Sequence, residues 1–184
     1  ALVVAIFTFL FSRKYLSWKE TYFYCFFGYA THGLLDACTS YGTQLFWPFS
    51  DERISWNNIS VVDPLLTVPV IIFIIISILK KNKFVTFFGV FYIFLYLGIG
   101  VVQENRAEKL GKSIAIMRGH ESKRLTVKPS LGNLFLWKAI YEDNGFYYVD
   151  AVRLLSKPEY CQGTKIKKLD ASNNFMELNQ NSQQ

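Results

Sequence analysis

Long apolar blocks alternate with short polar or basic stretches over the first hundred or so residues of the chain. The blocks cover residues 1–11, 21–47, 65–79 and 84–102, and the last contains 19 residues without a charge. A helix needs about 20 predominantly apolar residues to cross a bilayer. The pattern therefore predicts a membrane α-helical protein with about three to four transmembrane helices. The first block, only 11 residues long, is interpreted as the end of a helix that begins upstream, so we expect the N-terminal part to be missing.

The pattern changes after residue 102, where charged residues become frequent. Within residues 135–154, two runs of alternating apolar and polar residues flank Asn144-Gly145, and Asn-Gly between two such runs is a strong hairpin signal. We therefore expect two domains. Residues 1–102 form the transmembrane helical domain, and residues 103–184 form a small extramembrane α+β or β domain that contains this β-hairpin and ends in a polar tail from residue 165 onward.

Composition agrees with a membrane protein and excludes several other classes. The chain is 51% hydrophobic and 17% aromatic, which is higher than in an average soluble domain. The formal net charge of +6 is mild and its basic runs are short, so no nucleic-acid site is predicted. Cys25, Cys38 and Cys161 form no C-x-x-C pair, so neither a disulfide framework nor a cysteine zinc site is indicated.

Two basic stretches predict an orientation in the membrane. An excess of lysine and arginine marks the cytoplasmic side of a span, and residues 12–19 and 80–83 both carry such an excess. Two intervening spans would put both stretches on the same side. The loop over residues 50–62 and the C-terminal domain then lie on the opposite face, which in a bacterial cell is the periplasmic one. The bilayer lipids are the first expected partner.

Most polar residues of the first hundred gather between His32 and Pro64. His32 and Asp36 are four positions apart, so on a helix they project from the same face. An imidazole and a carboxylate at this spacing can bind one divalent metal ion, and zinc is the candidate. Ionisable groups at membrane depth are costly and usually functional. The alternative interpretation is a structural His–Asp hydrogen bond that ties two helices together.

Two further residues are candidates for catalysis. Catalytic zinc usually has three protein ligands and a water, so the pair needs other groups. Asp63 is the best candidate within the sequence because it precedes the next apolar segment, although the same carboxylate could cap that helix. Arg53 could bind an anion beside Asp51 and Glu52, although an exposed charged loop explains this cluster equally simply.

Three runs resemble one protein family. They are HGLLDACTSYG from His32, WPFS from Trp47 and VDP ending at Pro64. Together they resemble a family of bacterial inner-membrane proteins described as metal-dependent hydrolases, one of them as a LexA-binding, inner-membrane-associated hydrolase. The resemblance implies a multi-pass protein of the bacterial inner membrane. The histidine-rich H-R-G-x-T-H run of that family is absent here, so we expect further metal ligands to lie upstream.

The first functional hypothesis is a membrane-embedded, metal-dependent hydrolase of unknown substrate. A bound metal ion would lower the pKa of a water and polarise a phosphoryl or acyl oxygen. The aromatic cluster of Phe46, Trp47 and Phe49 suggests an amphiphilic or lipid-like substrate. One alternative is a non-enzymatic membrane anchor that binds a partner. Another is a transporter component with His32 and Asp36 in a proton or ion path.

Overall fold

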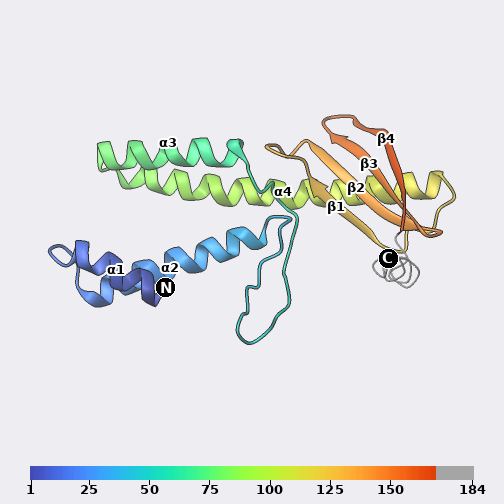
Figure 1. Cartoon of the computed structure of the whole chain (residues 1–184). Coiled ribbons are helices and arrows are strands. Elements are labelled where there is room, and N and C mark those ends of the chain that lie inside the picture. Colours follow the sequence, from blue (N-terminus) through green and yellow to red (C-terminus); the bar gives the residue numbers. More distant parts are fainter. Residues whose placement is uncertain (169–184) are drawn as a thin grey trace, which may run out of the picture.

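The computed structural model describes residues 1–168, in which four helices are followed by four strands (Figure 1). The helices are α1 (Leu2–Ser12), α2 (Trp18–Ala37), α3 (Pro64–Lys80) and α4 (Lys83–Met117). The strands are β1 (Leu125–Pro129), β2 (Leu136–Asp143), β3 (Phe146–Leu154) and β4 (Pro158–Lys167). The polar tail predicted from residue 165 falls largely outside the described residues.

The prediction of about three to four transmembrane helices is wrong. Within residues 1–168, α4 alone combines the length and the apolar composition that crossing a membrane requires. Helices α1 and α3 are apolar but have 11 and 17 residues, fewer than the roughly 20 of a typical span. Helix α2 has 20 residues, but Lys19, Glu20, His32 and Asp36 make it too polar. The multi-pass arrangement predicted from the apolar blocks is therefore also unsupported.

Side-chain caps determine where three of the helices begin. In α2, the Ser17 hydroxyl accepts a hydrogen bond from the Glu20 amide while the Glu20 carboxylate accepts one from the Ser17 amide, forming a capping box. Asp63 caps α3 and Pro64 follows at its first position, where the missing N–H costs nothing. Asn82 caps α4. Figure 1 shows α1 with α2 and α3 with α4 as two helical hairpins.

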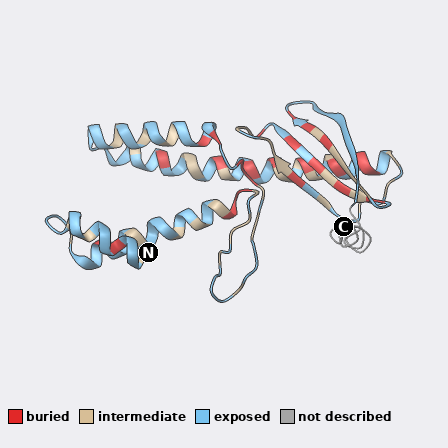
Figure 2. Ribbon diagram, in the orientation of Figure 1, coloured by how far each residue is buried: buried red, intermediate tan, exposed pale blue. Residues whose placement is uncertain are grey.

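Helix α4 changes its surroundings along its length. Its first part, up to about residue 102, exposes large apolar side chains such as Phe87, Phe94 and Val102. Its last part buries Gln103, Ala107, Gly111, Ile114 and Ala115. Figure 2 shows the first part of α4 as mostly pale blue with a few red segments, and the part beneath the strands as red alternating with tan and pale blue. The helix is continuous through residue 102, and the division into two domains at that point remains a prediction.

The strands form one antiparallel sheet in the order β1-β2-β3-β4. Strands β2 and β3 pair from Leu136 with Arg153 to Asp143 with Phe146, so the hairpin lies where the sequence predicts it. Asn144 and Gly145 connect them with φ values of 46° and 76°. Positive φ at both central residues is the requirement of the turn that Asn-Gly favours.

The inner face of the sheet packs on the last part of α4. Residues alternate between buried and more exposed along β2, as expected for a strand with one face covered. Trp137 and Val152 are fully buried and Tyr141 nearly so. Gly111 of α4 allows the close approach, because a Cβ at that position would lie 3.2 Å from the Ala139 Cβ atom. The main core of the protein therefore lies between α4 and the sheet.

Candidate functional site

The predicted metal ligands lie next to each other on α2. The His32 Nε2 atom is 3.3 Å from the Asp36 Oδ2 atom, one helical turn away, and the two side chains are 71% and 47% exposed. The side chains therefore share one open helix face, as the spacing predicts. In the described contacts, neither side chain forms a hydrogen bond to another helix, so the pair is accessible to a ligand.

The residues present do not complete a metal centre. Among residues 1–168, no group of three or more histidine, cysteine, aspartate or glutamate side chains could hold a metal ion. A catalytic zinc site usually needs three protein ligands, and His32 with Asp36 supplies two. The metal-binding role of this pair remains a prediction that needs ligands from outside the described residues.

Asp63 has a structural role in the described contacts. Asp63 is 4% exposed, and its Oδ1 atom accepts hydrogen bonds from the amides of Leu65 and Leu66 at 3.1 and 3.3 Å. Its Oδ2 atom accepts a hydrogen bond from the Tyr96 hydroxyl at 2.7 Å. Capping α3 and fastening it to α4 therefore uses both oxygens. A catalytic role for Asp63 remains a prediction.

Arg53 lies in the long connection between α2 and α3, which Figure 1 shows extending away from the helices. The connection is held by a β-bridge between Thr43 and Ile54. Arg53 is exposed and packs its stem beside Gly42. Thr39, just beyond the end of α2, donates its hydroxyl to the Asp36 carbonyl at 2.8 Å. It satisfies the backbone at the end of α2, and anion binding by Arg53 remains a prediction.

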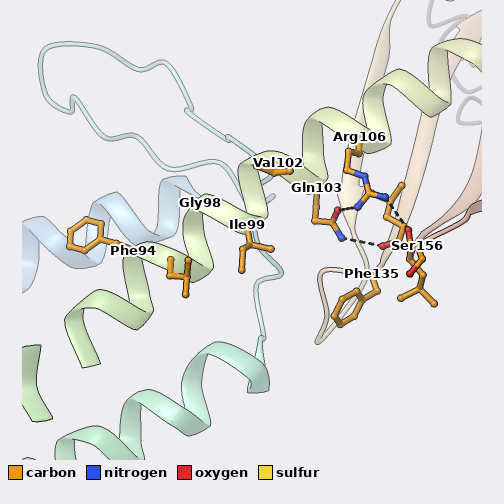
Figure 3. Close-up of a pocket in the computed structure, with 11 residues that line it drawn as sticks. Phe94, Gly98, Ile99, Val102, Gln103, Arg106, Phe135 and Ser156 are labelled. Atoms are coloured by element: carbon orange, nitrogen blue, oxygen red, sulfur yellow. Dashed lines mark hydrogen bonds between the residues drawn. The ribbon is translucent and has the colours of Figure 1, made fainter. Parts of the chain in front are cut away.

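A groove that the sequence reasoning missed lies where α4 passes from its exposed part to the sheet (Figure 3). Its volume is about 800 Å³, within the range of small-molecule sites. Phe94, Gly98, Ile99 and Val102 line it from α4, and Phe135 lines it from the segment before β2. Positions 94, 98, 102 and 106 recur every four residues on one face of α4, so an apolar stripe that ends at an arginine was the available signal in the sequence.

The polar end of the groove is a small hydrogen-bonded network. Buried Gln103 donates from its Nε2 atom to the carbonyls of Leu134 and Leu154 at 3.1 and 3.2 Å. Its Oε1 atom accepts a hydrogen bond of 2.7 Å from Arg106, whose other terminal nitrogen donates to the Leu155 carbonyl at 3.0 Å. Gln103 therefore fixes the position of the Arg106 guanidinium at the rim of the groove.

A second polar cluster fastens the end of α4 to the sheet. Arg118 donates to both carboxylate oxygens of Asp150, at 2.7 and 3.1 Å, and to the Tyr141 hydroxyl. These hydrogen bonds raise the pKa of Arg118, and burial raises the pKa of Tyr141. The Nδ1 atom of His120 lies 2.9 Å from the Tyr141 hydroxyl, and its ring packs against Tyr148. We assign this cluster to stability.

Comparison with known proteins identifies a family. A family model described as YdjM inner membrane protein matches residues 1–107 of the 184-residue chain. The match covers α1 to α3 and α4 as far as Ala107, and so includes His32, Asp36 and the helical wall of the groove. No curated protein and no solved structure matches the chain. The resemblance noted in the sequence is thus confirmed for an inner-membrane family, but not for metal-dependent hydrolysis or LexA binding.

Proposed function

The chain belongs to the YdjM inner membrane protein family, and from this premise we propose that it is a non-enzymatic membrane anchor that holds a folded sheet at the membrane surface for a partner. Membership makes it a membrane-associated protein. The anchor hypothesis requires one span and a rigid connection from that span to the exposed module. It does not require a metal ion or further histidine ligands.

One observation carries the proposal: α4 serves both parts of the molecule. This helix has 35 residues and so is about 50 Å long, more than the roughly 30 Å hydrocarbon core of a bilayer. Its first part is apolar and exposed, and its last part is buried beneath β1, β2 and β3. An unbroken helix of this kind transmits the position of the span directly to the sheet.

We further propose that the sheet lies outside the cytoplasm. Lys83 begins α4, and Lys80 and Lys81 lie just before it at the end of α3. Basic residues at the end of a span favour the cytoplasmic side. The other end of the helix, with its sheet, would then face the periplasm. Labelling of the exposed Cys161 thiol in intact spheroplasts tests this orientation.

The metal-dependent hydrolase is the second candidate, with a divalent ion, zinc or another, as its cofactor. It is favoured by the accessible His32–Asp36 pair, whose nitrogen and oxygen lie 3.3 Å apart. In this candidate the two side chains are two of the ligands, and the remaining ligands come from outside the described residues. An ion or proton path through the same pair remains a third prediction.

Metal content discriminates between these functions. We would measure divalent metal per protein for the full-length wild type, His32→Ala, Asp36→Asn and the double variant, with Asp51→Asn as an exposed control. The anchor proposal predicts that metal content does not depend on His32 or Asp36. Near-stoichiometric metal that is lost in either single variant, with little further loss in the double variant, would contradict the anchor and support the hydrolase.

A further inference from the structure

We propose that the groove beside Arg106 binds one anionic phospholipid, with its phosphate on Arg106 and an acyl chain along α4. This inference rests on the proposed role of α4 as the span, because the groove then lies at the boundary between hydrocarbon and water. Figure 3 shows the two halves of the groove, with the apolar side chains along α4 and the polar network beside the strands.

The apolar half of the groove is suited to an acyl chain. Phe94, Ile99 and Val102 are 70%, 45% and 58% exposed, so a large apolar surface needs a cover. Gly98 lies between them, and a Cβ at that position would meet no atom within 4 Å. The stripe from Phe94 to Arg106 covers about 18 Å of helix. A chain that enters from the bilayer can lie along this length.

The polar half is suited to a phosphate. Arg106 donates one terminal N–H to Gln103 and another to the Leu155 carbonyl, which leaves further donors of its guanidinium, a group with five N–H donors. Both known acceptors are neutral, so the positive charge is not neutralised by them. Guanidinium groups bind phosphate through short charge-assisted hydrogen bonds, and Gln103 holds this one in place.

No described carboxylate occupies the anion position. Arg106 forms no ion pair within residues 1–168. Glu104 and Glu108 are each two positions away, and side chains at that spacing do not face each other on a helix. Glu108 instead pairs with Lys112 at 2.6 Å. An anion from outside the described residues can therefore pair with Arg106.

The continuity of the two halves favours a phospholipid over a free phosphate ion. A phosphate ion would use only the Arg106 end and would leave the stripe of Phe94, Gly98 and Val102 uncovered. Basic side chains near a membrane surface attract anionic lipid head groups electrostatically. A lipid satisfies the charge and covers the apolar surface at once, and it is already present at that depth.

Lipid binding to the purified full-length protein in non-ionic detergent tests the inference. Native mass spectrometry would count adducts of phosphatidylglycerol and of phosphatidylcholine with identical acyl chains. We expect one phosphatidylglycerol molecule, bound about tenfold more tightly than phosphatidylcholine. Both lipids carry a phosphate, but the choline cation of phosphatidylcholine neutralises its head group and is repelled by the Arg106 guanidinium. Arg106→Gln should remove this preference, and Arg106→Lys should keep part of it. Inorganic phosphate should not displace the lipid.

Substitutions in the apolar half provide the matched comparison. Gly98→Leu fills the groove without touching the polar network, and it should weaken binding of both lipids about tenfold. Gly28→Leu is the control, because a Cβ there also meets no atom within 4 Å but lies on α2. Arg153→Gln removes a positive charge from the sheet and serves as the control for the effect of net charge on lipid binding.

Equal binding of the two lipids by the wild type would overturn the proposal. So would displacement by inorganic phosphate alone, or adducts that Gly98→Leu leaves unchanged. If Arg106→Gln lowers the unfolding temperature, Arg106→Lys and Gly98→Leu decide the outcome. Lipid binding is measured on purified protein in detergent, whereas the anchor proposal is tested by thiol labelling in spheroplasts. The two results are independent, so this inference and the anchor proposal can fail separately.

Discussion

Asp63 is a residue whose surroundings favour stability over catalysis. Its carboxylate accepts hydrogen bonds from the amides of Leu65 and Leu66 and from the Tyr96 hydroxyl. We expect Asp63→Ala to destabilise the protein by about 2 kcal/mol, since a cap is lost and a buried hydroxyl is left unpaired. Thermal unfolding in detergent measures this, with Asp51→Ala in the exposed loop as the control. An unfolding temperature equal to that of the control would contradict the structural role.

Asp150 supports a second prediction at the same scale. It is 2% exposed, and its partner Arg118 is 19% exposed, so removing the carboxylate leaves a largely buried guanidinium without a counter-charge. Asp150→Asn should cost about 3 kcal/mol of unfolding free energy. Glu159→Gln breaks the exposed pair with Arg153 in the same sheet and should cost less than about 1 kcal/mol. Chemical denaturation that gives equal losses for both variants would show that the cluster is unimportant.

Single residues were predicted from sequence where the reason is local. The contact between His32 and Asp36 follows from a spacing of four on a helix, and the turn at Asn144-Gly145 follows from its backbone preference. The groove at Arg106 depends on residues of α4 meeting residues around position 135 and position 155. No local rule gives that juxtaposition, so the sequence did not reveal it.

Secondary-structure elements were harder to predict than single residues, because the length of an apolar block in the sequence does not determine the length of the helix it forms. The apolar block over residues 21–47 continues ten residues beyond the end of α2 at Ala37. Treating the whole block as one span therefore overestimated the number of spans. Strand β4 was missed because it lacks a hydrophobic pattern. It is exposed at every position, and an edge strand without a buried face has no period in its sequence. Strands β2 and β3, which alternate on a covered face, were predicted.

Helix α4 packs closely against the sheet at Gly111, and this contact gives a prediction at the scale of elements. A side chain at Gly111 would press on the Ala139 Cβ atom and on Leu125 Cδ1, both 3.2 Å from the Cβ position. We expect Gly111→Leu to destabilise the packing of the sheet on α4 by about 1–3 kcal/mol relative to Gly98→Leu. Both variants replace a helical glycine by leucine and gain the same helix propensity, so the difference between their stabilities reports the effect on packing alone. Equal protease resistance of the C-terminal part in the two variants would contradict this interface.

At the scale of the whole molecule, α4 joins an exposed apolar part to a sheet. The exposed apolar part of α4 and its buried part follow each other without a break, so the two ends of the helix must lie on opposite sides of the bilayer if the anchor proposal is right. The lysines before α4 predict which side is cytoplasmic. The orientation and the span can therefore be tested together with two thiols.

The most direct measurement is labelling with a membrane-impermeant maleimide in intact and lysed spheroplasts. One variant keeps only the exposed Cys161 thiol, with Cys25→Ser and Cys38→Ala removing the others. The second adds Cys161→Ser and Lys81→Cys, which moves the thiol to the other end of α4. We predict that Cys161 is labelled in intact spheroplasts and that the thiol at position 81 is labelled only after lysis. The reverse pattern would overturn the orientation alone, whereas labelling of both thiols, or of neither, before lysis would contradict the central claim that α4 crosses the membrane.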